Sequence, residues 1–334
     1  MALSGIEIRR PDDMHVHLRE GSQLAHYARD AAASFARALV MPNTSPPIQS
    51  AVELRRYLRE ITEAAPGLVP LGTFKIHPKL SHDDVAALKE AGAAAGKYYP
   101  RGVTTNSEDG VAEVDAAFPV FEAMERLDLV LCIHGEMPGA FALEREERFL
   151  PELEKIVAAF PKLRIVLEHV STKEAVEMVR SLRGGVAATI TVHHLLFTLD
   201  DLLGDGLDPH LFCKPVVKRP GDRDAILQAA LSGDPRYFFG SDSAPHLRAA
   251  KEARRGAAGV YSMPVCMPLL AGLFEEHSSL ALLENFVSRF GAEFYRLPLN
   301  TGTLRIERSE WKVPDEYHGV VPLCAGQKLN WRIV

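Results

Sequence analysis

The 334-residue chain has little cysteine, little tryptophan and no excess of positive charge. Its four cysteines are far apart in the sequence, at positions 132, 213, 266 and 324, so we expect no disulfide framework. The formal net charge of −6 argues against a nucleic-acid partner. These shortages are typical of a protein from a reducing compartment, and we predict a cytoplasmic localisation.

Long apolar runs and glycine-rich phosphate loops are also missing. Residues 1–10 contain no apolar stretch of signal-peptide length, and no later segment reaches the roughly 20 apolar residues that span a membrane. No glycine-rich fingerprint follows the first expected strand, which disfavours a dinucleotide-binding fold. We therefore expect a soluble protein with no membrane partner.

Short apolar runs alternate with segments of helical period, which is the pattern of repeated βα units. Eight runs are expected to form strands, at residues 14–19, 36–43, 69–76, 94–99, 129–135, 164–170, 186–192 and 237–242. Between them, Leu54, Tyr57, Leu58 and Ile61 form an apolar helical stripe. Because no glycine- or serine-rich linker interrupts these units, they predict an α/β fold, a closed (β/α)₈ TIM barrel, rather than an open sheet.

The last quarter of the chain departs from this alternation. We expect two helices, at 265–276 and 279–290, and then extended segments at 303–307 and 327–333. The prediction is a single domain over residues 1–334, with the barrel at about 10–262 and C-terminal helices and a short extended tail at about 263–334. Ser81 with Asp84 and Ser171 with Glu174 have the spacing of a capping box at two helix starts.

Residues that can bind a metal recur at the ends of the expected strands. His15 and His17 are two residues apart in one strand, so both side chains project from the same face. His134, His169 and Asp242 each end a different strand. One strand-end histidine is more often a hydrogen-bonded core residue, and Asp242 alone could cap a helix. Since the strands of a barrel end at the same face, the five residues together predict a metal site there.

Lys97 lies within the fourth apolar run, where an unpaired ammonium would be costly to bury. A lysine in such a run is most often exposed. If its amine carries CO₂ as a carbamate, however, the side chain becomes an anion with two oxygens that can bridge two cations. With Asp242 and a bridging hydroxide as the other anions, this change lowers the charge of a two-metal site by two units. The sequence permits the modification.

The order of these motifs resembles that of the dihydroorotase family, and more narrowly its short bacterial and yeast-type members within the amidohydrolase superfamily. The matching stretches run from about Ile8 to Pro298 and are His15-Val-His17-Leu-Arg19, Met41-Pro42-Asn43, Gly96-Lys97-Tyr98-Tyr99-Pro100 with Thr104-Thr105-Asn106-Ser107, His134-Gly135-Glu136, Glu168-His169 and Asp242-Ser-Ala-Pro-His246. The resemblance implies a metal-dependent hydrolase barrel. It also implies reversible cyclisation of N-carbamoyl-L-aspartate to L-dihydroorotate plus water, in de novo pyrimidine (UMP) biosynthesis.

Roles for individual residues follow from the same resemblance. It implies two zinc ions per chain with a bridging hydroxide, one ion held by His15, His17, Lys97 and Asp242 and the other by carboxylated Lys97, His134 and His169. Asp242 would act as the catalytic acid and base. The substrate would contact Arg19, Asn43, His134, Lys214, His246 and Ala258, and Thr104 and Thr105 would belong to a mobile loop that closes over it. The resemblance also implies a homodimer.

The sequence departs from the family pattern at two places, and two alternative functions stay open. Lys214 stands where family members usually carry an apolar residue, so a cation would lie near the substrate ring. Residues 254–257 lack cysteines that some members have, so we expect no additional metal site there. Another cyclic amidase such as a hydantoinase stays possible, although Arg19, Asn43 and His246 provide for a carboxylate that plain hydantoins lack. A catalytically silent barrel that acts as a binding partner is the remote alternative.

Overall fold

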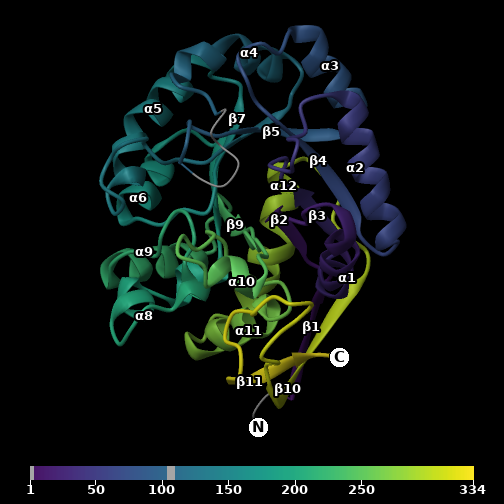
Figure 1. Ribbon diagram of the computed structural model, residues 1–334, viewed down its shortest axis with the longest axis vertical. Coiled ribbons are helices and arrows are strands. Elements are labelled where there is room, and N and C mark those ends of the chain that lie inside the picture. Colours follow the sequence, from purple (N-terminus) through teal and green to yellow (C-terminus); the bar gives the residue numbers. More distant parts are fainter. Residues whose placement is uncertain (1–3, 104–109) are drawn as a thin grey trace.

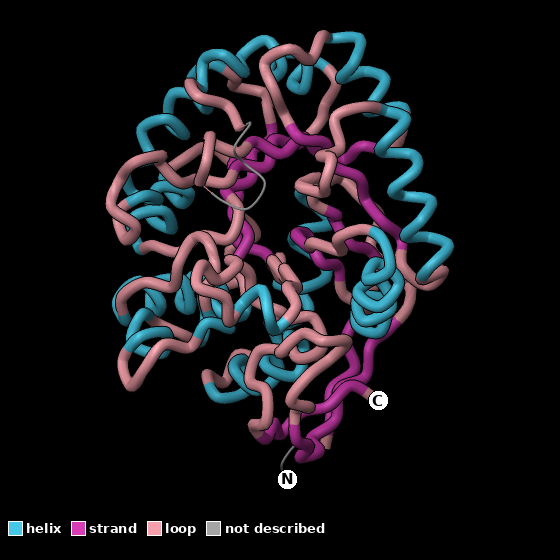
Figure 2. The backbone as a smooth tube through the Cα atoms, in the orientation of Figure 1, coloured by secondary structure: helices cyan, strands magenta, loops and turns pink. Residues whose placement is uncertain are grey.

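The computed structural model describes residues 4–103 and 110–334 (Figure 1). Eight parallel strands follow one another around a barrel in chain order: β2 (Asp12–Val16), β3 (Arg37–Val40), β4 (Val69–Lys75), β5 (Ala93–Tyr98), β6 (Val130–Ile133), β7 (Arg164–Leu167), β8 (Val186–Ile190) and β9 (Tyr237–Phe239). Figure 2 shows these strands as an inner ring with the helices around it. The predicted (β/α)₈ TIM barrel is confirmed.

Hydrogen bonds between the first and last strands close the barrel. The His17 N–H donates to the Ser243 carbonyl (3.0 Å), and the Asp242 N–H donates to the His15 carbonyl (2.8 Å). Val16 and Ser243 form a parallel bridge between the same segments. The carboxyl ends of β2 and β9, both rich in polar residues, are therefore held side by side.

Helices cover the outside of the strands. The longer ones within the barrel units are α1 (Leu24–Ser34), α2 (Ala51–Ala64), α3 (His82–Glu90), α4 (Phe118–Arg126), α5 (Arg145–Ala159), α6 (Lys173–Ser181) and α9 (Pro220–Leu231), and the shorter ones are α7 (Val192–Leu196), α8 (Leu199–Leu203) and α10 (Arg248–Lys251). The predicted stripe of α2 buries Leu54, Tyr57 and Ile61. No helix in the described ranges is long and apolar enough to cross a bilayer.

Of the two predicted capping boxes, one is confirmed and one is wrong. Ser81 and Asp84 form the reciprocal pair at the start of α3. At α6 the capping residue is Thr172, whose hydroxyl accepts the Ala175 N–H. The Ser171 N–H instead donates to the buried carboxylate of Glu146 on α5 (2.9 Å). This tertiary contact moves the start of α6 one residue along the chain.

The longest helix of the C-terminal part is α11 (Cys266–Glu276), close to the first predicted range. The second predicted helix is instead a 3₁₀ turn (Leu280–Leu282), a π-helix (Asn285–Arg289) and α12 (Phe290–Phe294). Side chains fix this segment to the start of the chain, because the Arg9 N–H donates to Glu284 and the Ser288 hydroxyl donates to the Arg9 carbonyl. The apolar pattern alone does not reveal such contacts.

A small antiparallel sheet lies beside the barrel, close to both ends of the chain (Figure 1). It consists of β1 (Gly5–Arg9), β10 (Thr303–Lys312) and β11 (Lys328–Ile333), with β10 in the middle. The two predicted extended segments are thus strands, and the first is longer than expected. β1 was not predicted, because its partner β10 is nearly 300 residues away in the sequence.

An apolar cluster fills the interior of the barrel. Leu39, Val130, Val166 and Phe238 are completely buried in it, and Phe290 and Tyr295 join it from the C-terminal segment. Polar side chains that point inward therefore gather at the carboxyl ends of the strands.

Candidate active site

The carboxyl ends of the strands bring the predicted metal ligands together. The His15 ring centroid lies 5.4 Å from that of His17 and 5.0 Å from that of His169, and His169 lies 4.8 Å from His134. The Asp242 carboxylate completes the group, since its Oδ1 lies 3.1 Å from His17 Nε2 and 3.4 Å from His15 Nε2. All five side chains are buried, so few water molecules compete for these nitrogen and oxygen atoms.

Hydrogen bonds orient three of these imidazoles. Each directs one ring nitrogen at a side-chain oxygen, and the pairs are His15 Nδ1 with Glu168 (2.7 Å), His17 Nδ1 with Asn43 (2.7 Å) and His134 Nε2 with Glu136 (2.8 Å). A nitrogen that donates to such an oxygen leaves the opposite nitrogen with a lone pair. This arrangement is typical of metal-binding histidines.

Lys97 and His169 carry buried polar atoms that are otherwise unsatisfied. Lys97 Nζ and His169 Nδ1 have no hydrogen-bond partner within residues 4–103 and 110–334. Burial lowers the pKa of Lys97, and burial together with the Lys97 charge holds the pKa of His169 well below its usual value. Unpartnered buried polar atoms are costly unless a ligand binds them, so this donor set fits a metal centre.

Burial also favours the uncharged form of His17 and His134. It lowers the pKa of His17 to about 4 and that of His134 in the same direction. Neutral imidazoles are the form that binds metal ions. Asp242 is the opposite case: burial raises the pKa of its carboxyl group, but the hydrogen bond with His17 acts in the other direction, and the pKa lies well below its usual range.

Five of the six predicted substrate residues, all but His246, line the same hollow. It measures about 380 Å³ including the space open to solvent, and its lining residues are His15, His17, Arg19, Asn43, Tyr99, His134, His169, Lys214, Asp242, Ala244, Ala258 and Gly259. Lys97 contacts the site from below, with Nζ 5.4 Å from the centroid of the Tyr99 ring. Thr104 and Thr105 lie outside the described residues.

Arg19, His246 and Ala258 form a connected polar group at the rim. Arg19 Nε donates to the Pro245 carbonyl (3.0 Å), and Arg19 Nη2 lies 3.0 Å from Nε2 of His246. The same His246 nitrogen lies 3.0 Å from the Ala258 carbonyl. Burial lowers the pKa of His246 to about 3, so the guanidinium of Arg19 is the cation of this group.

Unusual backbone conformations occur at several site positions. Arg19, His169 and Asp242 have φ values of +58°, +43° and +42°, in the left-handed region that side chains disfavour. Gly259 has φ of +149°, and a Cβ there would come within 2.4 Å of the Ala244 carbonyl oxygen. Barrel closure and side-chain contacts hold these residues in backbone conformations that are intrinsically unfavourable.

Three residues of the site received no role from sequence reasoning. Glu168 and Glu136 orient His15 and His134, and Tyr99 lines the hollow. A glutamate within two residues of a strand-end histidine was the sequence signal that could have revealed both carboxylates. Glu168 directly precedes His169, and Glu136 follows His134 by two residues.

Fold and site together define a barrel hydrolase of the amidohydrolase class. The family model described as Amidohydrolase matches residues 13–184, about half of the chain. Dihydroorotase from Teredinibacter turnerae is 42% identical over 98% of both proteins. The crystal structure of dihydroorotase in complex with 5-fluoroorotic acid from Saccharomyces cerevisiae superposes with a TM-score of 0.94 at 36% identity, covering 99% of each chain. The chain belongs to the dihydroorotase family.

The hydantoinase alternative has much weaker support. L-hydantoinase from Arthrobacter aurescens is similar with a TM-score of 0.85 but only 15% identity, and this chain covers 83% of it. At that level of identity the likeness extends to the fold alone.

Proposed function

We propose that this protein is a zinc-dependent cyclic amide hydrolase that interconverts N-carbamoyl-L-aspartate and L-dihydroorotate plus water in de novo pyrimidine biosynthesis. The observation that carries the proposal is the shared hollow, in which a cluster of metal donors lies next to the guanidinium of Arg19. Hydrolysis of a cyclic amide requires the first group, and recognition of a substrate carboxylate requires the second. A plain hydantoin would leave the buried guanidinium without an anion.

We assign one zinc ion to His15, His17, Lys97 and Asp242, and a second to carboxylated Lys97, His134 and His169. The lowered pKa of Lys97 supports the carbamate, because the neutral amine is the form that reacts with CO₂. The unpartnered, buried Nζ supports it as well. When bound, the two ions supply Lewis-acid polarisation of the scissile carbonyl and a water that is acidic at neutral pH.

Asp242 moves the proton in this proposal. During ring opening its carboxylate accepts a proton from the attacking water and passes it to the leaving ring nitrogen. During ring closure the protonated carboxyl group donates to the departing hydroxyl. The low pKa of Asp242 keeps the carboxylate ionised and ready to accept a proton at neutral pH.

The remaining residues bind and orient the substrate. The planar guanidinium of Arg19 offers paired N–H donors to the substrate carboxylate, with Asn43, His246 and Ala258 beside it. Lys214 adds a cation on the wall of the hollow. Thr104 and Thr105, which lie outside the described residues, are proposed to close over the substrate and exclude water.

We also propose a cytoplasmic homodimer. The free thiols at positions 132, 213, 266 and 324 support a reducing compartment. Sedimentation at several protein concentrations tests the dimer, and fractionation of the source cells tests the compartment.

Ring opening of L-dihydroorotate by the purified protein is the decisive assay. Activity is expected to disappear on chelation and to return with zinc, with two ions per chain required for full activity. A hydantoin without a carboxylate serves as the comparison substrate and is expected to react far more slowly. Two bound ions with no activity on L-dihydroorotate would reject the substrate assignment, whereas absence of metal would reject the catalytic centre itself.

A further inference from the structure

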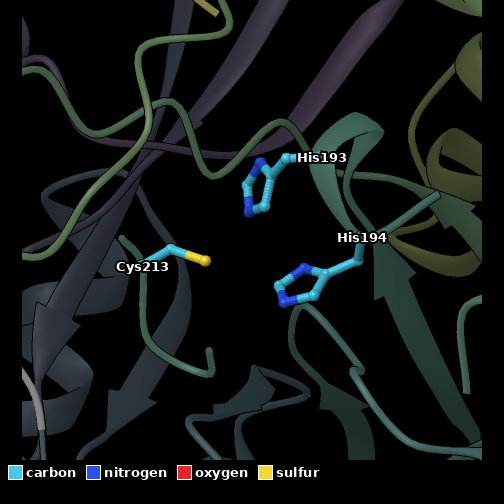
Figure 3. A group of neighbouring side chains, drawn as sticks. All are labelled: His193, His194 and Cys213. Atoms are coloured by element: carbon cyan, nitrogen blue, oxygen red, sulfur yellow. The ribbon is translucent and has the colours of Figure 1, made fainter. Parts of the chain in front are cut away.

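A second group of potential metal ligands lies outside the catalytic centre. His193 and His194 belong to α7, and Cys213 comes from the loop before α9. One ligand atom from each lies within 4.8 Å of the other two, and all three residues are buried. Figure 3 shows the two imidazole rings and the thiol directed at the same space.

His193 shows most clearly that the cluster is suited to a ligand. The side chain is completely buried, and neither ring nitrogen has a hydrogen-bond partner in the described part of the chain. Protonation does not offset this cost, because burial lowers the pKa of His193 to about 4. A neutral imidazole with two unsatisfied nitrogens is costly to bury, and a cation that accepts one lone pair would reduce that cost.

The other two ligands are held by weak, replaceable contacts. His194 Nε2 and Cys213 Sγ both lie 3.1 Å from the Pro215 carbonyl oxygen. The Thr191 hydroxyl lies 2.8 Å from His194 Nδ1 and fixes the ring. An ion bound by His194 and Cys213 would replace the shared contacts to Pro215 with stronger bonds to nitrogen and sulfur.

The donor set restricts the kind of ion. Two imidazoles and one thiolate favour soft or borderline ions such as Cu⁺ and Zn²⁺ over Mg²⁺ or Ca²⁺. Burial raises the pKa of the Cys213 thiol to about 12, while the nearby ammonium groups of Lys251 and Lys218 act in the opposite direction. Binding therefore requires that the metal displace the thiol proton, which leaves to solvent as the metal–sulfur bond forms.

We propose that His193, His194 and Cys213 form an additional metal site, separate from the catalytic centre, that takes a thiophilic ion through two imidazole nitrogens and one thiolate. The site lies beside the substrate hollow, because Cys213 directly precedes Lys214 in the lining. It lies away from residues 254–257, where missing cysteines predicted no additional metal site.

Cobalt titration of the metal-free protein tests the site, since a cobalt–thiolate bond has an intense charge-transfer band in the near ultraviolet. The residues assigned to the catalytic centre supply only nitrogen and oxygen ligands, so Co²⁺ bound there does not produce this band. The expected result is one band-forming Co²⁺ per chain. A parallel anaerobic titration with Cu⁺ against a chromogenic chelator distinguishes monovalent from divalent preference.

Two variants and one control give the test its specificity. Cys213→Ser is expected to abolish the band, and His193→Phe is expected to weaken Co²⁺ binding at least tenfold without removing a hydrogen bond. Cys266→Ser is the matched control, because Cys266 is also a buried thiol that donates to a backbone carbonyl, that of Met263 (3.4 Å). It is expected to keep the band.

Circular dichroism establishes that each variant is folded. The proposal is overturned if neither Co²⁺ nor Cu⁺ binds with sulfur ligation, if the band persists in Cys213→Ser, or if His193→Phe binds Co²⁺ as tightly as the original protein. The second variant keeps the proposal testable even if Cys213→Ser does not fold.

Discussion

Buried polar and charged groups are paired at one end of the barrel, whereas some of those described at the other end lack partners. At the amino end, Arg37 donates from Nε and Nη2 to Asp12 (2.8 and 2.5 Å) and from Nη1 to the Pro298 carbonyl (2.8 Å). Asn300 Nδ2 donates to Asp12 as well (2.8 Å). At the carboxyl end, Lys97 Nζ and His169 Nδ1 are buried without a partner among the described residues.

The comparison indicates that the amino end of the barrel contributes to stability, whereas the carboxyl end is adapted to function. At the amino end Asp12 and Arg37 neutralise each other and make several hydrogen bonds, so the ion pair holds the strands and the C-terminal tail together. At the carboxyl end, unsatisfied buried polar atoms and left-handed backbone conformations cost free energy, and a ligand bound to the polar atoms would offset part of that cost. Substitutions at the two ends should therefore change different measurements.

The largest effect on activity is expected for Lys97→Met. The variant should lose the metal of the proposed catalytic centre and all measurable turnover, because the proposed bridging group is gone. The metal-free variant should nevertheless unfold at a higher urea concentration than the metal-free original, because an unpartnered buried amine costs about 1–3 kcal/mol. Lower stability of the metal-free variant would contradict the proposed difference between the two ends.

Asp242→Asn is expected to lower kcat by about 10²–10⁴-fold, the usual contribution of a general acid and base. Metal content should stay close to that of the original protein, since the amide oxygen can still act as a ligand. Metal analysis and steady-state kinetics on the same sample test this. Loss of metal equal to that in Lys97→Met would remove the separate catalytic role of Asp242.

Asp12→Ala should destabilise the amino end by about 3–5 kcal/mol, because it leaves the buried Arg37 guanidinium without its counter-charge. Metal content and kcat should not change at temperatures where the variant is folded. Glu63→Ala is the control, since its ion pair with Arg59 is 4.0 Å long and mostly exposed, and should cost less than about 0.5 kcal/mol. Equal losses of unfolding free energy in the two variants would contradict the structural role of the buried pair.

Glu146 should make stability depend on pH at the carboxyl end. Burial raises its pKa from 4.5 to about 7. Between these values the folded protein retains a proton that the unfolded chain releases, so the free energy of unfolding falls as pH rises through this range. The loss is complete above the folded-state pKa and amounts to a value on the order of 3 kcal/mol.

Glu146→Gln should remove that pH dependence. The variant should be more stable than the original protein above about pH 7 and should lose this advantage below about pH 4.5, as measured by urea unfolding across the range. Glu147→Gln is the matched control, because the neighbouring Glu147 is exposed. Parallel stability profiles for Glu146→Gln and the original protein would show that Glu146 is not the titrating group.

Arg19→Lys is expected to have the smallest effect of the series. A lysine keeps the positive charge but loses the planar pair of donors, so KM should rise about tenfold, equivalent to about 1.4 kcal/mol, with little change in kcat. An unchanged KM would remove Arg19 from the proposed carboxylate site.

The sequence by itself determined the barrel and the position of the predicted metal ligands within it. Both follow from local regularities: alternation of apolar runs with helical stripes predicts βα units, and the two-residue period of a strand directs His15 and His17 to one face. Since every parallel strand of a barrel ends at the same face, His134, His169 and Asp242 could be assigned to that face without coordinates.

Only the tertiary structure decided which groups touch across the chain. Glu168 orients His15 from 153 residues away, and β1 pairs with β10 across almost the whole sequence. The same holds for the start of α6, where the contact of Ser171 with Glu146 overrides a local capping signal. His193, His194 and Cys213 likewise become a cluster only in the fold. Such contacts depend on how the helices and strands pack against one another. Neither the hydrophobic period nor the spacing of residues along the chain specifies this packing directly.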